Sequence, residues 1–224
     1  MSYIEELGIA AKKAERAVTG ISVQQKNAAL KAISDKLLAC KELITKENAR
    51  DLATAEANGM SQSMLDRLTL TESRIEAMSE GVLQVMALDD PIGEVLGGRD
   101  LPNGLHIIKK RVPLGVIGII FESRPNVTVD AASLCLKSGN VCILRGGSDA
   151  IHSNKCLVSL MREALKETGV CEDAIALVVD TSRQVAGEMM KLNQYIDVLI
   201  PRGGGGLIRS VMQNSTIPVI QTGE

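Results

Sequence analysis

Apolar residues in the first part of the chain recur every three or four positions, which is typical of one face of an amphipathic helix. One such series consists of Ile4, Leu7, Ala11, Ala14 and Val18. Further helices are expected to begin where Ser or Thr lies three residues before Gln or Glu, because the two side chains cap a helix start reciprocally. These pairs are Ser22/Gln25 and Thr69/Glu72, and Asn58-Gly59 is expected to end the helix between them. The pattern predicts a helical region over residues 1–88, with a packing role.

The pattern changes between residues 89 and 112, where glycine and proline separate short apolar runs. Asn103-Gly104 lies between two of these runs, and this pair is a strong signal for a tight turn between antiparallel strands. We therefore predict a β-hairpin extension over residues 89–112. Lys109, Lys110 and Arg111 are interpreted as a solvated strand end, in preference to a patch for an anionic substrate.

From residue 113 to residue 224, strand-length apolar runs alternate with helix-length segments. Val116–Phe121 is apolar throughout, which is typical of a parallel strand covered on both faces. Further strands are predicted at 141–144, 174–179, 198–200 and 218–220, with helices at 127–137, 149–166, 182–192 and 206–213. Strands joined by helix-length crossovers predict an α/β fold with a doubly wound parallel sheet, in which ligands bind at the carboxyl ends of the strands.

Composition and charge exclude several kinds of partner. The net charge is −2 and no long basic run occurs, so nucleic acid is not expected. Two Tyr, one Phe and no Trp provide no stacking platform for bases or sugars. No apolar segment approaches the roughly 20 residues of a membrane span, and the acidic start lacks the apolar core of a signal peptide. A cytoplasmic protein with no membrane partner is predicted.

The cysteines and histidines indicate no metal site. The five cysteines, at positions 40, 135, 142, 156 and 171, show no Cys-x-x-Cys spacing and no neighbouring histidine pair. In a cytoplasmic protein, free thiols fit this pattern better than disulfides or zinc ligands. His106 and His152 are interpreted as surface residues.

Three segments that follow predicted strands carry candidate chemistry. In Glu122-Ser123-Arg124-Pro125-Asn126, the arginine could hold a phosphate or carboxylate through two hydrogen bonds, and the amide could donate to an oxyanion. The four glycines of Pro201-Arg202-Gly203-Gly204-Gly205-Gly206 could let a pyrophosphate approach a helix start. The third segment is Arg145-Gly146-Gly147-Ser148-Asp149. Structural alternatives remain open, with Asn126, Ser148 or Asp149 serving as helix caps.

Residues 113–128 and 201–207 resemble the γ-glutamyl phosphate reductases, a family within the aldehyde dehydrogenase superfamily. The resemblance covers essentially the whole chain, including residues 46–52 and 65–68. It implies a Rossmann-like cofactor domain of the aldehyde dehydrogenase type. It also implies the reduction of L-glutamate 5-phosphate by NADPH to L-glutamate 5-semialdehyde and phosphate, in proline biosynthesis. In that reaction a cysteine thiolate displaces phosphate, and hydride then reduces the thioester.

The same resemblance implies roles for individual residues. Ser123 and Arg124 would bind substrate, and Asn126 would be an oxyanion donor. The cofactor-binding residues would be Arg145, Gly146, Ser148, Arg202, Gly203, Gly204 and Gly205. The superfamily often has a carboxylate near position 148, which favours NAD; an arginine at 145 and a serine at 148 favour NADPH instead.

The resemblance also implies what the rest of the protein contributes. No Arg-Pro-x-x-Cys-Asn motif occurs, so the nucleophilic cysteine is expected beyond Glu224 and the 224-residue chain alone is expected to be inactive. The hairpin is expected to pair with a neighbouring subunit in a homo-oligomer, and glutamate 5-kinase is a candidate partner. Two alternatives are a non-catalytic nucleotide-binding fragment and an aldehyde-oxidising, NAD-dependent superfamily member. The latter would carry a Pro-Trp-Asn-like loop in place of residues 122–126.

Overall fold

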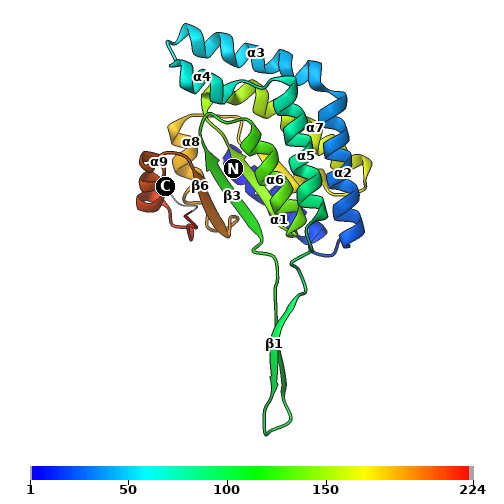
Figure 1. Ribbon diagram of the computed structural model, residues 1–224. Coiled ribbons are helices and arrows are strands. Elements are labelled where there is room, and N and C mark those ends of the chain that lie inside the picture. Colours follow the sequence, from blue (N-terminus) through cyan, green and yellow to red (C-terminus); the bar gives the residue numbers. More distant parts are fainter. Residues whose placement is uncertain (1, 222–224) are drawn as a thin grey trace.

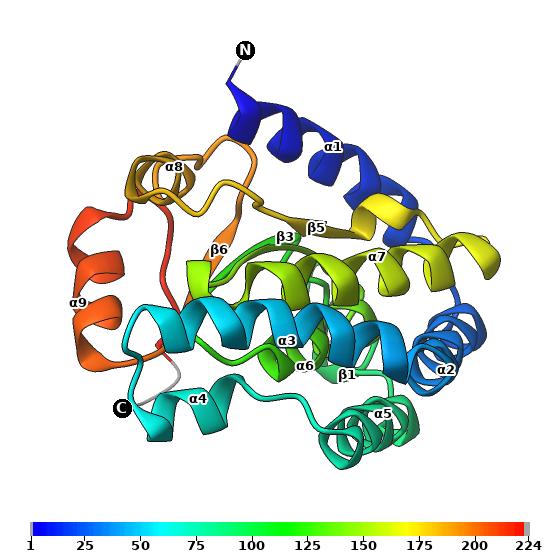
Figure 2. The same ribbon diagram turned by 90° about the horizontal axis from the view of Figure 1, so that it is seen from above.

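A parallel sheet covered by helices on both faces forms the body of the molecule (Figures 1 and 2). The computed structural model describes residues 2–221. The four strands lie in the order β5-β4-β3-β6 and all run parallel. Their bounds are Val116–Phe121 for β3, Val141–Arg145 for β4, Ile175–Leu177 for β5 and Val198–Arg202 for β6. Every residue of β3 is buried, as its unbroken apolar run predicted.

Helices from both halves of the chain cover the sheet. The first five are α1 (Tyr3–Val18), α2 (Val23–Ala39), α3 (Lys41–Ala57), α4 (Gln62–Leu68) and α5 (Glu72–Ala87). The later four are α6 (Asn126–Lys137), α7 (Ile151–Glu167), α8 (Arg183–Met189) and α9 (Gly205–Asn214). Figure 2 shows α1 and α8 on one face and α6 and α7 on the other, with α2, α3 and α5 as an outer layer.

Capping explains where several helices begin. The capping box predicted at Ser22 and Gln25 is present, with hydrogen bonds of 3.2 and 2.9 Å between the two residues. The predicted start at Thr69 is wrong, because Thr71 caps α5 by accepting the N–H of Arg74 at 3.2 Å. Helix α4 was not predicted, since seven residues are too few for apolar periodicity to show.

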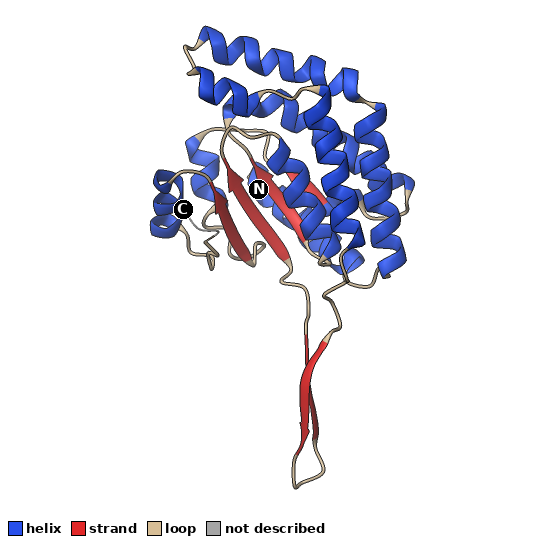
Figure 3. Cartoon of the chain, in the orientation of Figure 1, coloured by secondary structure: helices blue, strands red, loops and turns tan. Residues whose placement is uncertain are grey.

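The predicted hairpin is present and projects from the body as a two-stranded arm (Figures 1 and 3). It consists of β1 (Val95–Asp100) and β2 (His106–Lys110), which pair antiparallel. Gly104 forms the turn with a φ of 85°, a conformation that side-chain-bearing residues rarely adopt. All residues of both strands are exposed, and the side chain of His106 is 75% exposed.

Two strand predictions differ from the structure at the edges of the sheet. The strand predicted at 218–220 is wrong as a regular strand, because Val219 forms only a single bridge to Leu199. Strand β5 is shorter than predicted: residues 172–174 form a 3-10 turn. Beyond β5, the N–H of Val179 donates to the hydroxyl of Tyr3 at 2.9 Å instead of to a neighbouring strand.

Candidate functional site

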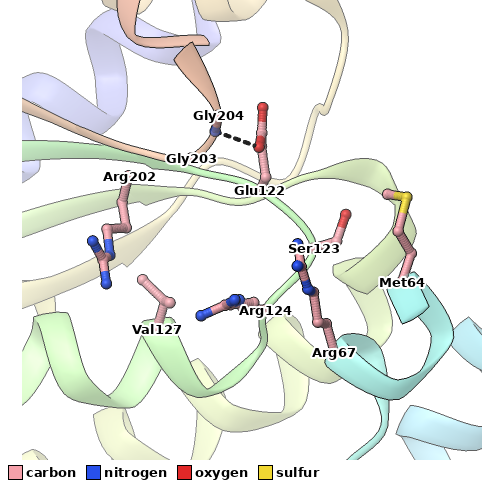
Figure 4. Close-up of a pocket in the computed structure, with 9 residues that line it drawn as sticks. All are labelled: Met64, Arg67, Glu122, Ser123, Arg124, Val127, Arg202, Gly203 and Gly204. Carbon is pink, nitrogen blue, oxygen red and sulfur yellow. Dashed lines mark hydrogen bonds between the residues drawn. The ribbon is translucent and has the colours of Figure 1, made fainter. Parts of the chain in front are cut away.

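A cavity of about 330 Å³ lies at the carboxyl ends of β3 and β6 (Figure 4). Phe121 and Arg202 pair at the ends of these neighbouring strands, so the loops that follow emerge side by side. The lining comes from residues 122–124 after β3, from Arg202 at the end of β6 with the two glycines that follow it, from Val127 of α6, and from Met64 and Arg67 of α4. Two of the three chemically interesting segments of the sequence therefore meet at one cavity, in the position where parallel sheets bind ligands.

The loop after β3 is held at both of its ends. The hydroxyl of Ser123 donates to the carboxylate of Asp149, which ties this loop to the one after β4. The carbonyl of Arg124 accepts the N–H of Val127 at 3.0 Å, and Pro125 precedes α6 as its N-cap residue with a φ of −59°. The side chain of Arg124 is thus carried by a turn that packing and hydrogen bonds fix in place.

Glu122 occupies the start of α9. Its carboxylate accepts the N–H of Gly204 at 2.9 Å, where the helix dipole favours negative charge. A Cβ on Gly203 would lie 2.7 Å from this carboxylate, so the close approach of Glu122 requires glycine at that position. Gly204 is the N-cap residue of α9 and Gly205 is its first residue. One backbone donor of the glycine segment is therefore already bound to a side chain of the same molecule.

Three guanidinium groups, those of Arg67, Arg124 and Arg202, lie around the cavity, as Figure 4 shows. Within residues 2–221, none of the three forms an ion pair. Partial burial raises the pKa of Asp130, although a hydrogen bond from Asn126 and the charge of Arg202 act in the opposite direction. The arrangement gives the cavity an excess of positive charge, which suits an anionic ligand.

Asn126 lies outside this cavity. Its amide donates to the carboxylate of Asp130 at 3.1 Å, and it lines an adjacent cavity of about 430 Å³ that also borders on Arg67 and Arg124. It does not cap α6, whose N-cap residue is Pro125. Its assignment as an oxyanion donor stays a prediction.

Arg145, Gly146 and Ser148 form a separate group at the end of β4. Arg145 donates to the carbonyl of Thr181 at 2.6 Å, and its Nε is buried without a hydrogen-bond partner among residues 2–221. Burial lowers the pKa of Arg145, while the nearby charges of Asp149 and Asp180 raise it.

The segment around Gly146 also packs tightly. A Cβ on Gly146 would lie 2.3 Å from the amide nitrogen of Asn154, so contact with α7 requires glycine. Ser148 opens a 3-10 turn (Ser148–Ala150), and neither Ser148 nor Asp149 is an N-cap residue. The helix-capping alternative considered for these two residues is therefore wrong.

Two of the five cysteines have a raised thiol pKa, which disfavours the nucleophilic thiolate. Contact with Cys135 and burial raise the pKa of Cys142, and burial raises the pKa of Cys156 to about 11. None of the five lines the cavity at β3 and β6. Residues 2–221 contain no group of three or more His, Cys, Asp or Glu side chains that could hold a metal ion, and no helix among them could cross a membrane.

Two residues of α4 that line the cavity, Met64 and Arg67, were not predicted as site residues, and Arg67 is the charged one. It belongs to the short helix α4, in a region interpreted as packing only. No periodic or capping signal connects a surface arginine of such a helix to the end of a distant strand, because the contact exists only in the folded molecule.

Comparison with known proteins gives consistent matches along the chain. Residues 3–221 match the aldehyde dehydrogenase family. A γ-glutamyl phosphate reductase of Lachnospira eligens is 52% identical over 223 residues, which are 100% of this chain and 54% of that protein. One from Clostridium botulinum (strain Eklund 17B / Type B) is 55% identical over 216 residues, 96% of this chain and 52% of that protein. The chain spans about half the length of the curated relatives it matches.

Solved structures give the same picture of the fold. The γ-glutamyl phosphate reductase of Thermotoga maritima superposes with a TM-score of 0.97 at 43% identity, covering 99% of this chain and 54% of that one. A probable aldehyde dehydrogenase of Listeria monocytogenes superposes with a TM-score of 0.75 at 19% identity, covering 98% of this chain and 45% of that one. The second likeness concerns the fold alone.

Proposed function

Because the chain belongs to the aldehyde dehydrogenase family, we propose that it forms the cofactor-binding part of a γ-glutamyl phosphate reductase. The proposed reaction is the reduction of L-glutamate 5-phosphate by NADPH to L-glutamate 5-semialdehyde and phosphate, in proline biosynthesis. The observation that carries the proposal is the cavity at the ends of β3 and β6, where three unpaired arginines suit a substrate with two anionic ends. Identities of 52% and 55% with named reductases support the same assignment.

The residues at the ends of β4 and β6 fit a dinucleotide cofactor. The N–H groups of Gly205 and Gly206 at the start of α9 have no acceptor among the described residues, and a pyrophosphate beside them would supply one. The N–H groups of Gly204 and Leu207 already donate, to Glu122 and to the carbonyl of Gly204. The buried Nε of Arg145 is a donor that lacks an acceptor among the described residues. We assign Arg145, Gly146 and Ser148 to the adenosine side of the cofactor. NADPH would supply the hydride for the reaction.

The preference for NADPH over NADH is part of the proposal. A guanidinium group at position 145 and a hydroxyl at position 148 favour a ribose 2′-phosphate, which a carboxylate at 148 would repel. Asp149 and Asp180 lie close enough to Arg145 to act on its charge, and they weaken this preference. The balance between one guanidinium and two carboxylates is therefore expected to set the cofactor selectivity.

In the proposed mechanism Arg124 binds an anionic end of the substrate at the carboxyl end of β3. Ser123 fixes the loop after β3 through its hydrogen bond to Asp149. The nucleophile is proposed to lie outside the five cysteines of this chain. The absence of all five from the cavity supports this, as do the raised pKa of Cys142, caused by contact with Cys135 and burial, and that of Cys156, caused by burial. The 224-residue chain alone is therefore proposed to bind ligands without turning over substrate.

The hairpin at residues 89–112 is proposed to mediate homo-oligomerisation. Its strands expose apolar side chains, among them Val95 at 56% and Ile108 at 60% exposed, and an unpaired two-stranded arm is a template for pairing with another chain.

The experiment that tests the proposed function uses the full-length protein with L-glutamate 5-phosphate and NADPH. Inorganic phosphate should be released in step with NADPH consumption, because each acyl phosphate that is reduced loses one phosphate as the leaving group. The 224-residue chain at the same concentration should release none. Oxidation of aldehydes with NAD and without phosphate would favour the other superfamily activity and overturn the proposal.

A further inference from the structure

Helix α4 contributes to the cavity an arginine, Arg67, to which the sequence assigned no binding role. Arg67 and Arg124 line both the cavity at the ends of β3 and β6 and its neighbour beside α5, so the two side chains stand at the boundary between these cavities. Figure 4 shows Arg67 rising from α4 towards Ser123, and Arg124 extending from the loop towards Val127. Two guanidinium groups from distant parts of the chain thus approach one space.

A comparison with the next arginine along the chain shows that Arg67 is not engaged in holding the fold. Arg74 pairs with the carboxylate of Asp66 at 2.9 Å and donates to the carbonyl of Thr69 at 3.0 Å, so its charge is compensated and it secures the connection from α4 to α5. The side chain of Arg67 forms no comparable contact within residues 2–221. Its donors stay available for a ligand.

The backbone that carries Arg67 is nevertheless fixed. Asn48 of α3, which is 1% exposed, donates to the carbonyl of Leu68 at 2.9 Å and accepts the N–H of Leu70 at 2.8 Å. These two bonds clamp the chain directly after Arg67. An arginine whose backbone is held and whose side chain is unpaired binds an anion with little loss of backbone entropy.

The charges around the cavity indicate which anion it suits. The lining of this cavity contains three guanidinium groups and one carboxylate, that of Glu122, which bonds to Gly204. In the neighbouring cavity, Asp130 compensates part of the charge of Arg202, and an excess of positive charge remains. A dianion compensates this excess better than a monoanionic carboxylate does. Resting on the proposed function, we propose that Arg67 is a substrate-binding residue that, together with Arg124, holds the phosphate group of the acyl phosphate.

Binding of inorganic phosphate to the 224-residue chain tests this assignment without any need for turnover. In calorimetric titrations, Arg67→Gln is expected to weaken phosphate binding roughly tenfold to a hundredfold, the range for a charge-assisted hydrogen bond. Arg67→Lys should restore part of the affinity. The matched control is Arg16→Gln on α1, which removes the same charge from an exposed position and should bind phosphate like the wild type. Equal affinity of Arg67→Gln and wild type would overturn the proposal, as would a wild-type chain that binds no phosphate.

Two further measurements separate this role from its alternatives. The unfolding temperature of Arg67→Gln should equal or exceed that of the wild type, because the substitution removes no bond and relieves repulsion; a marked decrease would identify a structural role.

Arg145→Ala distinguishes a site for the phosphate of the substrate from a site for the 2′-phosphate of the cofactor. It should weaken binding of 2′,5′-ADP, which stands for the adenosine side of the cofactor, and leave the titration with inorganic phosphate unchanged. Loss of inorganic phosphate binding in Arg145→Ala would move the phosphate site away from Arg67.

The carboxylate end of the substrate is tested with glutarate as the probe. If Arg67→Gln weakens glutarate binding and leaves phosphate binding intact, Arg67 binds a carboxylate, and its assignment to the phosphate group is wrong. Failure of the proposed function is recognised separately, as Arg67-dependent phosphate binding by a protein that cannot reduce L-glutamate 5-phosphate. An active reductase in which Arg67→Gln changes neither phosphate affinity nor the KM for the acyl phosphate would refute the inference about Arg67 alone.

Discussion

Replacing Asp90 with Asn is expected to destabilise the chain strongly, because it leaves a buried lysine without its partner. Lys26 donates to Asp90 at 2.8 Å, and the two side chains are only 4% and 10% exposed. Lys137, which is 3% exposed, also acts on Asp90 and donates to the carbonyl of Met86 at 2.8 Å. Asp90 thus pairs with one buried lysine, and the charge of a second buried lysine also acts on it.

The magnitude follows from the cost of an unpaired buried charge. Removing one partner of a buried ion pair typically costs about 3–5 kcal/mol. Asp90→Asn should fall in this range, since it keeps the shape but leaves both lysines uncompensated. Lys26→Met should cost less, because Asp90 keeps the N–H of Ile92 at 2.9 Å and the charge of Lys137. The double variant should be more stable than the sum of the two single losses implies.

Urea unfolding of the wild type, the two single variants and the double variant at neutral pH measures the coupling free energy between Lys26 and Asp90. The pH dependence of the unfolding free energy tests whether folding lowers the pKa of Asp90. Burial raises the pKa of Asp90, but the hydrogen bonds from Lys26 and Ile92 and the charges of both lysines outweigh burial and lower it. A carboxyl group whose pKa is lowered on folding stabilises the protein above its unfolded pKa of about 3.9. That contribution is lost as the pH falls through the folded pKa. A cost of Asp90→Asn below about 0.5 kcal/mol at neutral pH would refute the reasoning.

Three further predictions concern the proposed sites. Arg124→Lys in the full-length enzyme should raise the KM for L-glutamate 5-phosphate, because lysine cannot bind an anion bidentately. A fall in kcat as well would show that Arg124 stabilises the departing phosphate, and an unchanged KM and kcat would place Arg124 outside the site. Arg145→Ala should weaken NADPH binding by about ten- to a hundredfold and NADH binding much less, as measured by fluorescence titration, whereas equal losses would leave Arg145 a structural residue. Ile108→Asp on the hairpin should lower the molar mass measured by light scattering, and an unchanged mass would remove β2 from the oligomer interface.

The elements that were predicted correctly are those with the strongest local sequence patterns. The unbroken apolar run at 116–121 predicted a buried parallel strand, and Asn103-Gly104 predicted the turn of the hairpin, because both features act locally. The error at 218–220 arose because an apolar run does not specify how many residues pair with a neighbour. The helix start at Thr69 was misplaced by two residues, since two threonines offered a similar cap.

The cavity could be predicted only in part. Arg124 and Arg202 could be predicted as site residues, because they lie at or just after the carboxyl ends of parallel strands and these ends meet at one edge of the sheet. Arg67 could not be found in this way, since α3 and the clamp of Asn48 bring α4 to that edge through tertiary contacts. The bond from Gly204 to Glu122 was also hidden, because it joins residues 82 positions apart in the sequence.

If the complete enzyme reduces an acyl phosphate with a nicotinamide cofactor, as proposed, the reverse reaction must consume inorganic phosphate. This dependence on phosphate is the most direct test. Full-length protein supplied with L-glutamate 5-semialdehyde and NADP should form NADPH at a rate that rises with inorganic phosphate and saturates. Without phosphate the rate should be negligible, since water would otherwise have to take its place. Equal rates with and without phosphate, or a clear preference for NAD in its absence, would contradict the account.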